Sequence, residues 1–245
     1  MKRFSLLFAL VAMVFTFSTA AYPEGEPLNS ETELIITGEL NVASINAPNG
    51  IIVERGAKLT VNGEVSAGDH FECRGGVIVI RGNLEADRVW LDSSAERLDM
   101  RVDGGVIAKY YTQSGGAVSV GGDMLLPVTD GYDGLGALNV SNEHARYGES
   151  TLDVTGGVFA LGGTIIVGSG GVDEVCAAAF EAVRTSRSPE EYAVPVFAFD
   201  EPLLPTAEPA LSISGKVVTA GTATVWSGTL NAPNLDKNNL RVISN

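Results

Sequence analysis

Aliphatic residues recur along this chain of 245 residues at an almost constant spacing of 19 or 20. The recurring positions are Leu40, Leu59, Ile78, Leu98, Val118, Leu138 and Val158. At most of them a second aliphatic residue or a methionine follows two positions later, as in Leu40-Asn41-Val42. A fixed period of this length indicates a repeat architecture, in which no single unit buries its own apolar face. We therefore expect a solenoid of stacked β-rungs, with about 20 residues per rung.

The segments between the turns have the pattern of β-strands. Leu34-Ile35-Ile36, Ile51-Ile52-Val53 and Leu59-Thr60-Val61 are short apolar or alternating runs bounded by Gly, Asn or Pro, which is typical of strands. No amphipathic helix pattern appears between residues 34 and 170. In a parallel stack, equivalent residues of successive rungs lie about 4.8 Å apart and form continuous ladders. The predicted fold class is all-β, a single-stranded parallel β-helix.

The N-terminal segment 1–21 has the three-part layout of a secretory signal peptide. A basic start at Lys2-Arg3 precedes an apolar run from Phe4 to Phe17, and small residues follow as far as Ala21. The run is shorter than the roughly 20 residues that span a bilayer, so a cleaved signal is favoured over an uncleaved anchor. We expect a leader segment over residues 22–33, a β-helix domain over 34–245, and no membrane span after cleavage. The predicted localisation is secreted, cell-surface or periplasmic.

Residues 171–209 interrupt the repeat. Residues 172–184 are rich in Ala and have apolar residues at helical spacing, which predicts a short helix, and a proline-rich stretch follows. We interpret residues 171–209 as an excursion from the solenoid. Strand patterns return at Leu211, and Asn-Ala-Pro-Asn at 231–234 repeats the same four residues at 46–49. This echo indicates re-entry into the same fold.

The charge and the cysteines limit the partners of the chain. With 30 acidic and 16 basic residues the net charge is −14, so the chain lacks the basic surface that binds a phosphate backbone, and nucleic acid is not expected. The negative charge could serve to keep the protein soluble or to attract cations. Cys73 and Cys176 are the only cysteines. They would lie about five rungs apart in a regular stack, too far for a disulfide, so we expect both to be unpaired.

Charged residues around Asp99 are the first candidates for catalysis. Asp99 and Arg101 would share one strand face, which suits a polysaccharide lyase that uses a basic side chain and acid-bound Ca²⁺. A solvated strand with alternating charge explains the same residues. Asp130 and Asp133 are candidate Ca²⁺ ligands, although a tight Gly-Asp turn accounts for them equally well. The sequence has no zinc-ligand cluster, Walker motif or nucleophile elbow, and no other cofactor is predicted.

Aromatic residues are the candidates for ligand binding, because their rings stack on sugars. The candidates are Trp90, Tyr110, Tyr111 and Tyr132. If Tyr110 and Tyr111 lie on a strand, alternation directs one of the two rings outward. An outward tyrosine with no ligand is the competing interpretation.

Two runs, 53–63 (VERGAKLTVNG) and 152–163 (LDVTGGVFALGG), resemble the repeats of bacterial secreted right-handed parallel β-helix proteins of the adhesin and carbohydrate-binding type. They are also similar to the bactofilin polymer-forming solenoids, which are cytoplasmic and have no cleaved signal, so that similarity is one of architecture. The resemblance covers residues 34–168 and 211–243. It implies a right-handed coil and, for the carbohydrate-binding family, calcium and acidic glycan ligands.

Three functions fit these features. The first is a non-catalytic, adhesin-like solenoid, secreted or at the cell surface, that binds a polysaccharide or extracellular matrix component through an outward face. The second is a polysaccharide lyase or hydrolase acting on acidic glycans, with Asp99 and Arg101 in its site. The third is a self-assembling structural solenoid whose rungs associate end to end.

Overall fold

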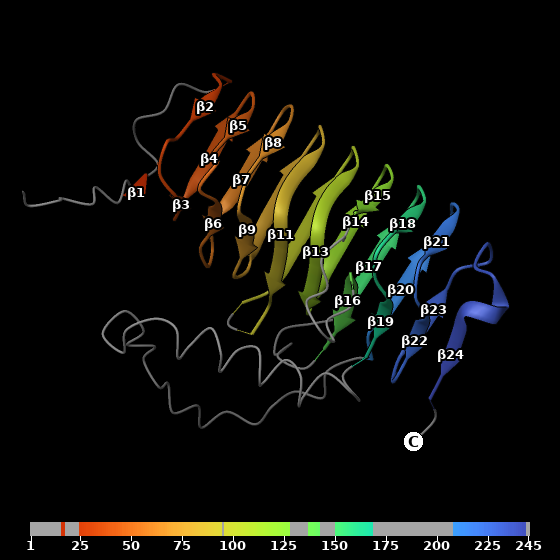
Figure 1. Cartoon of the computed structure of the whole chain (residues 1–245). Helices are drawn as coiled ribbons and strands as arrows, with labels where there is room; N and C mark the ends of the chain where they lie inside the picture. The colour runs from red at the N-terminus through yellow and green to blue at the C-terminus, as the bar shows by residue number, and fades with distance from the viewer. Residues whose placement is uncertain are drawn as a thin grey trace, which may run out of the picture.

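The chain forms a series of coils, and each coil contributes short strands that pair in parallel with the strands of its neighbours (Figure 1). The structure is a computed structural model that describes the backbone of residues 16–17 and, in full, residues 25–94, 96–127, 137–142, 150–168 and 208–243. The strands fall into three columns, defined below. This arrangement is consistent with the expected parallel β-solenoid.

Column 1 is one complete sheet. Its strands are β4 (Glu39–Val42), β7 (Lys58–Val61), β10 (Gly76–Ile80), β12 (Leu98–Val102), β14 (Gly116–Val120), β17 (Ser150–Val154), β20 (Ala210–Ile213) and β23 (Thr229–Asn231).

Columns 2 and 3 are branches of the second sheet, and two long strands run through both: β11 (Leu84–Asp92) and β13 (Val106–Ser114). Column 2 also contains β2 (Leu28–Asn29), β5 (Ile45–Asn46), β8 (Val65–Ser66), β15 (Met124–Leu126), β18 (Val158–Ala160) and β21 (Val217–Thr219). Column 3 also contains β3 (Leu34–Ile36), β6 (Ile51–Val53), β9 (His70–Cys73), β16 (Leu138–Ser141), β19 (Ile165–Val167), β22 (Ala223–Val225) and β24 (Leu240–Val242). The short strand β1 (Thr16–Phe17) pairs with β3, and one 3₁₀ turn, η1 (Lys237–Asn239), precedes β24.

Alternate residues of each strand build one continuous apolar interior. In β7, Leu59 and Val61 are buried while Lys58 is exposed, and in β10 Ile78 and Ile80 are buried while Val77 is 46% exposed. The same alternation in columns 2 and 3 encloses a single core cluster from Leu28 to Val225. Because side chains of a strand point alternately to its two faces, each coil supplies an inward and an outward row to every column.

The predicted aliphatic ladder is correct over its first three positions and wrong at three later ones. Leu40, Leu59 and Ile78 are in register, but the next partner is Met100, followed by Val118. Leu98 lies two residues earlier, beside Gly76. Val118 then pairs with Leu152, because Leu138 and Val158 belong to columns 3 and 2. The coils differ in length at their corners, which a constant period cannot represent.

Glycines make two of the tight corners between columns 3 and 1. Gly76 and Gly116 have φ values of +103° and +87°, which L-residues with a side chain rarely adopt. A Cβ atom at Gly76 would lie 2.3 Å from the carbonyl oxygen of Ala57, and one at Gly116 would lie 2.5 Å from the Leu98 side chain. Gly76 therefore lets two backbones approach closely, and Gly116 gives Leu98 the room that it occupies at the start of β12.

The predicted segment boundaries agree only in part with the observed strands. The stack begins within the predicted leader, because β2 pairs with β5 and Leu28 is buried. Ala210 pairs with Thr151, so β20 continues column 1 directly after β17, as expected of a return to the stack. The two Asn-Ala-Pro-Asn runs follow different columns, since Asn46 ends β5 and Asn231 ends β23. The predicted signal peptide apart from β1, and the predicted helix over 172–184, lie outside the described residues.

Replacing Ile78 by Ala should destabilise the protein by about 2–5 kcal/mol, because it leaves a cavity in the column 1 ladder. The neighbouring change Val77→Ala should cost less than about 0.5 kcal/mol, since it removes an outward side chain. Urea unfolding followed by circular dichroism measures both. Equal losses at the two positions would contradict the assigned alternation.

Candidate functional site

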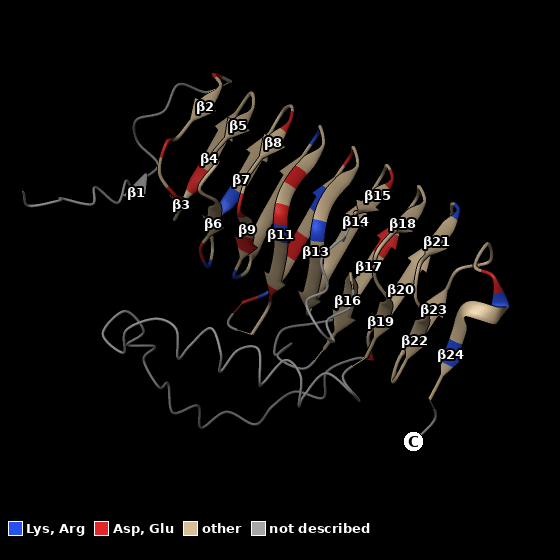
Figure 2. Ribbon diagram, in the orientation of Figure 1, with Lys and Arg blue, Asp and Glu red and all other residues tan. Residues whose placement is uncertain are grey.

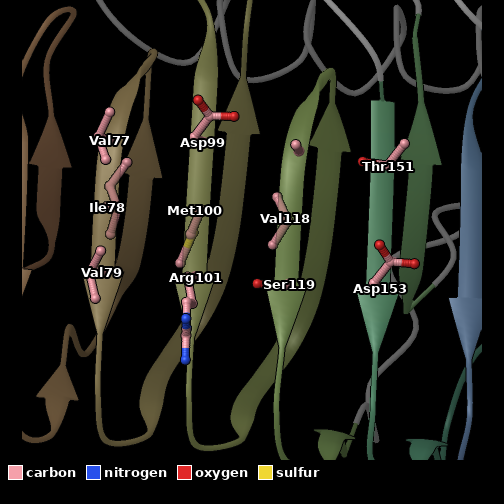
Figure 3. Close-up of a pocket in the computed structure, with 11 residues that line it drawn as sticks. Val77, Ile78, Val79, Asp99, Met100, Arg101, Val118, Ser119, Thr151 and Asp153 are labelled. Carbon is pink, nitrogen blue, oxygen red and sulfur yellow. The ribbon is translucent and has the colours of Figure 1, made fainter.

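The outward face of column 1 carries an open, shallow depression of about 230 Å³ across β10, β12, β14 and β17 (Figure 3). Two outward rows line it. The first row contains Val77, Asp99, Ala117 and Thr151, and the second contains Val79, Arg101, Ser119 and Asp153. Carboxylate, guanidinium and hydroxyl groups thus lie beside small apolar side chains on one nearly flat surface.

Strand pairing brings together residues that are distant in the sequence. Arg101 pairs with Ser119, and Ser119 pairs with Asp153. Adjacent strands are about 4.8 Å apart, so the two oppositely charged residues lie two strands apart across the Ser119 hydroxyl. This combination comes from three coils and has no counterpart within any single sequence motif.

Asp99 and Arg101 form exposed ion pairs, with Arg97 just before β12 and with Asp103 in the turn after it. Arg101 Nε donates to Asp103 Oδ1 at 2.5 Å, and Arg97 Nε lies 3.2 Å from Asp99 Oδ2. The Arg101 side chain is 67% exposed. Exposed pairs of this kind contribute little to stability, so these groups can exchange their partners for a ligand at small cost.

Asp99 and Arg101, which the sequence identified as a candidate catalytic pair, both line this depression. Figure 3 shows them on β12 on either side of Met100. The shared strand face is therefore confirmed. Each of the two has its own ion-pair partner, and the surface around them is open. This geometry suits hydrogen bonding to a bound chain, and the depression does not enclose a reacting group.

Three of the four aromatic candidates, Trp90, Tyr110 and Tyr111, lie on column 3, away from the depression. Trp90 on β11 points outward and is 39% exposed. Tyr110 on β13 is half-buried and packs against the core cluster. It pairs with Arg88, so it neighbours Trp90 diagonally across the two strands. Tyr132 lies outside the described residues. Trp90 and Tyr110 form a second candidate surface.

Tyr111 is the inward member of the tyrosine pair, and its ring does not reach the surface. Its side chain is 1% exposed, and its hydroxyl donates to Gln113 Oε1 at 3.0 Å. Gln113 Nε2 in turn donates to the carbonyl oxygens of Gly116 and Thr151 at 2.9 and 3.0 Å. Burial raises the pKa of Tyr111 far above its usual value. Through these hydrogen bonds, Tyr111 and Gln113 join column 3 to column 1 inside the core.

A separate cluster of charged side chains links the coils at the corner between columns 2 and 3. His70 lies 3.2 Å from Glu33 and 3.1 Å from Asp69, and Arg88 donates to Asp69 at 2.8 Å. Partial burial raises the pKa of Asp69, but the hydrogen bond from His70 and the charge of Arg88 outweigh it and hold the pKa below its usual value. The Arg88–Asp69 pair connects neighbouring coils and the His70–Glu33 contact spans two coils, which is a structural role.

The predicted metal ligands Asp130 and Asp133 lie outside the described residues. Within the described ranges, no group of three or more His, Cys, Asp or Glu side chains is placed to hold a metal ion. Nor does the described part of the chain contain a helix long and apolar enough to cross a bilayer. Comparison of the chain with family models, curated proteins and solved structures found no match.

Cys73 is a free thiol in the core, as expected, and it donates to the carbonyl oxygen of Gly75 at 3.3 Å. Burial raises the pKa of this thiol to about 12. Since the thiolate is the reactive form, Cys73 is not an available nucleophile at neutral pH. Cys176 lies outside the described residues.

In the variant Cys176→Ser, iodoacetamide at pH 8 should leave Cys73 unmodified while the protein is folded. The pH is far below the pKa of the buried thiol, and the sulfur is enclosed. The same reagent should label it at once in denaturant, where the pKa returns to its ordinary value. Mass spectrometry measures the label. Labelling of the folded protein at the rate of an exposed cysteine would contradict this placement.

Proposed function

We propose that this protein is a non-catalytic, right-handed β-solenoid, secreted or held at the cell surface, that binds a polysaccharide along the outward face of column 1. The depression on that face is the observation that carries the proposal. It is open along the stack, so an extended polymer can lie across successive strands.

The residues that line the depression have the chemistry that sugars require. Asp99, Asp153 and Arg101 offer planar, charged groups that exchange several hydrogen bonds with adjacent hydroxyls. Ser119 and Thr151 add hydroxyls, and the side chains of Val77 and Val79 offer apolar contact to the carbon face of a sugar ring. Arg101 would also pair with the carboxylate of an acidic sugar.

Further features support the proposed export, surface location and handedness of the solenoid. The predicted signal peptide supports export, and the resemblance of the repeats to secreted β-helix proteins supports a surface role. Crossovers between parallel strands of one sheet are almost always right-handed, which supports the proposed hand. Trp90 and Tyr110 form the second surface that the same function could use.

Affinity electrophoresis through gels that contain alginate, pectate or a neutral glucan tests this function. The unmodified protein should be retarded by at least one polysaccharide. Arg101→Ala should weaken binding about tenfold or more, because a charge-assisted hydrogen bond contributes about 1.5–3 kcal/mol.

Arg88→Ala is the matched control for the column 1 site, since Arg88 is a half-exposed arginine paired with Asp69 that lies outside the depression, on β11 beside Tyr110. It should bind like the unmodified protein. If Trp90→Ala lost polysaccharide binding while Arg101→Ala kept it in full, the binding site would lie on column 3 instead. Absence of binding to every polysaccharide would contradict the function itself.

A further inference from the structure

The last strand that the structure describes, β24, has uncovered inward side chains. Leu240 and Val242 of β24 are 41% and 66% exposed, whereas their partners one coil earlier, Ala223 and Val225, are 0% and 7% exposed. Among the described strands, β24 has β22 as its one neighbour. Apolar residues that continue an interior ladder are thus presented to solvent at the end of the stack.

The backbone of β24 is directed for a further parallel strand. Ile243 N donates to Val225 O at 2.9 Å, so the groups of Arg241 and Ile243 point toward β22. Residues of a strand point their backbone groups alternately to the two sides. The N–H and C=O groups of Leu240 and Val242 consequently point away from β22, toward the open side.

The opposite end of the solenoid offers the complementary edge. In β3, Leu34 N donates to Gly50 O at 3.0 Å and Ile36 O accepts from Glu54 N at 2.8 Å, so Leu34 and Ile36 point toward β6. Ile35 therefore points its groups outward. That edge is able to take a parallel strand, because β1 pairs with it there. Residues 16–17 fall within the predicted signal peptide, so cleavage would leave the edge of β3 open.

Charge also distinguishes the two ends. Residues 25–54 contain no Lys or Arg, and they include Glu26, Glu31, Glu33 and Glu39. The last coil carries Lys237 and Arg241 beside the single acid Asp236. Figure 2 shows the acidic segments around β3 and β4 and the basic ones at η1 and β24. The end surfaces are therefore of opposite sign, which favours contact between unlike ends and disfavours contact between like ends.

We propose that a second copy of this chain docks end to end, with β24 of one copy adding in parallel to β3 of the next once the predicted signal peptide is removed. Leu240 then takes the ladder position before Leu34 of the next copy, and Val242 the position before Ile36. The contact is head to tail, so it leaves a free edge at each end and extends into a filament. It is independent of the proposed glycan site, which lies on the outward face of column 1.

Sedimentation velocity over a wide range of concentration tests this contact. The chain that begins at Tyr22 should form species larger than the monomer, and the full chain, which keeps its signal segment, should not. High salt should reduce the association, because it screens the opposite charges. Circular dichroism and a cooperative melt establish that each protein is folded. A folded processed chain that stays monomeric at every concentration would overturn the proposal.

Two variants of the processed chain test the direction of the contact. Val242→Lys places a charge on the β24 edge, and Ile35→Pro removes the outward N–H of β3, which an edge strand tolerates. Each variant alone should be monomeric. Their mixture should form dimers and nothing larger, since each protein retains one working end. Ile107→Lys, a matched change of an exposed aliphatic residue on the outward face of column 2, should assemble like the unmodified chain.

Association by Ile35→Pro alone, combined with its loss in Val242→Lys, would indicate that two β24 strands pair with each other. That outcome would contradict the head-to-tail arrangement. A mixture of the two variants that remains monomeric would contradict it equally. Polysaccharide binding by the Val242→Lys monomer is expected to persist, so failure of one proposal leaves the other standing.

Discussion

Parallel backbone hydrogen bonding between successive coils is the interaction on which the remaining structure depends. It holds equivalent residues about 4.8 Å apart and fixes which side chains face inward. A slip of one residue would turn Leu59 and Val61 out to solvent and bring Lys58 and Thr60 into the core. The register is therefore specified by every coil, and the apolar interior and the hydrogen bonds reinforce each other.

Because the ladder constrains the strands and not the corners, the coils tolerate insertions of very different length. Leu40 and Leu59 are direct partners in the ladder, and so are Leu152 and Leu211, although a far longer stretch of chain separates the second pair. The outward face of column 1 stays continuous across both intervals. The depression can thus combine Arg101 with Asp153, and a surface site arises from coils that share no sequence motif.

The sequence predicts the ladder where corners are short and fails where they vary. The interval from Ile78 to Met100 is longer than the average period, and the interval from Met100 to Val118 is shorter by the same amount. The two deviations cancel, so Leu98 matches the constant period although it is not the ladder residue. Tyr110 and Tyr111 show a similar limit. Alternation requires one ring outside, but the alternation changes phase at Lys109-Tyr110, where β13 passes from column 2 to column 3, and this change places Tyr111 inside. The burial of Gln113 could not be predicted from the sequence, because a polar residue on a strand is usually exposed. The shared face of Asp99 and Arg101 could be predicted from the sequence, since residues two positions apart on a strand point to the same side.

Electron paramagnetic resonance distances between spin labels along one outward row test the stacking most directly. The row runs through Asn41, Thr60, Val79, Arg101, Ser119, Asp153 and Ser212. With Cys176 replaced by Ser and Cys73 left buried, labels would be attached at Asn41→Cys and either Asp153→Cys or Ser212→Cys.

Five and six strand spacings predict backbone separations of about 24 and about 29 Å for the two pairs. The long stretch of chain between Asp153 and Ser212 should thus add a single spacing of about 4.8 Å. An increase of several spacings, or a shorter distance to position 212, would contradict the account.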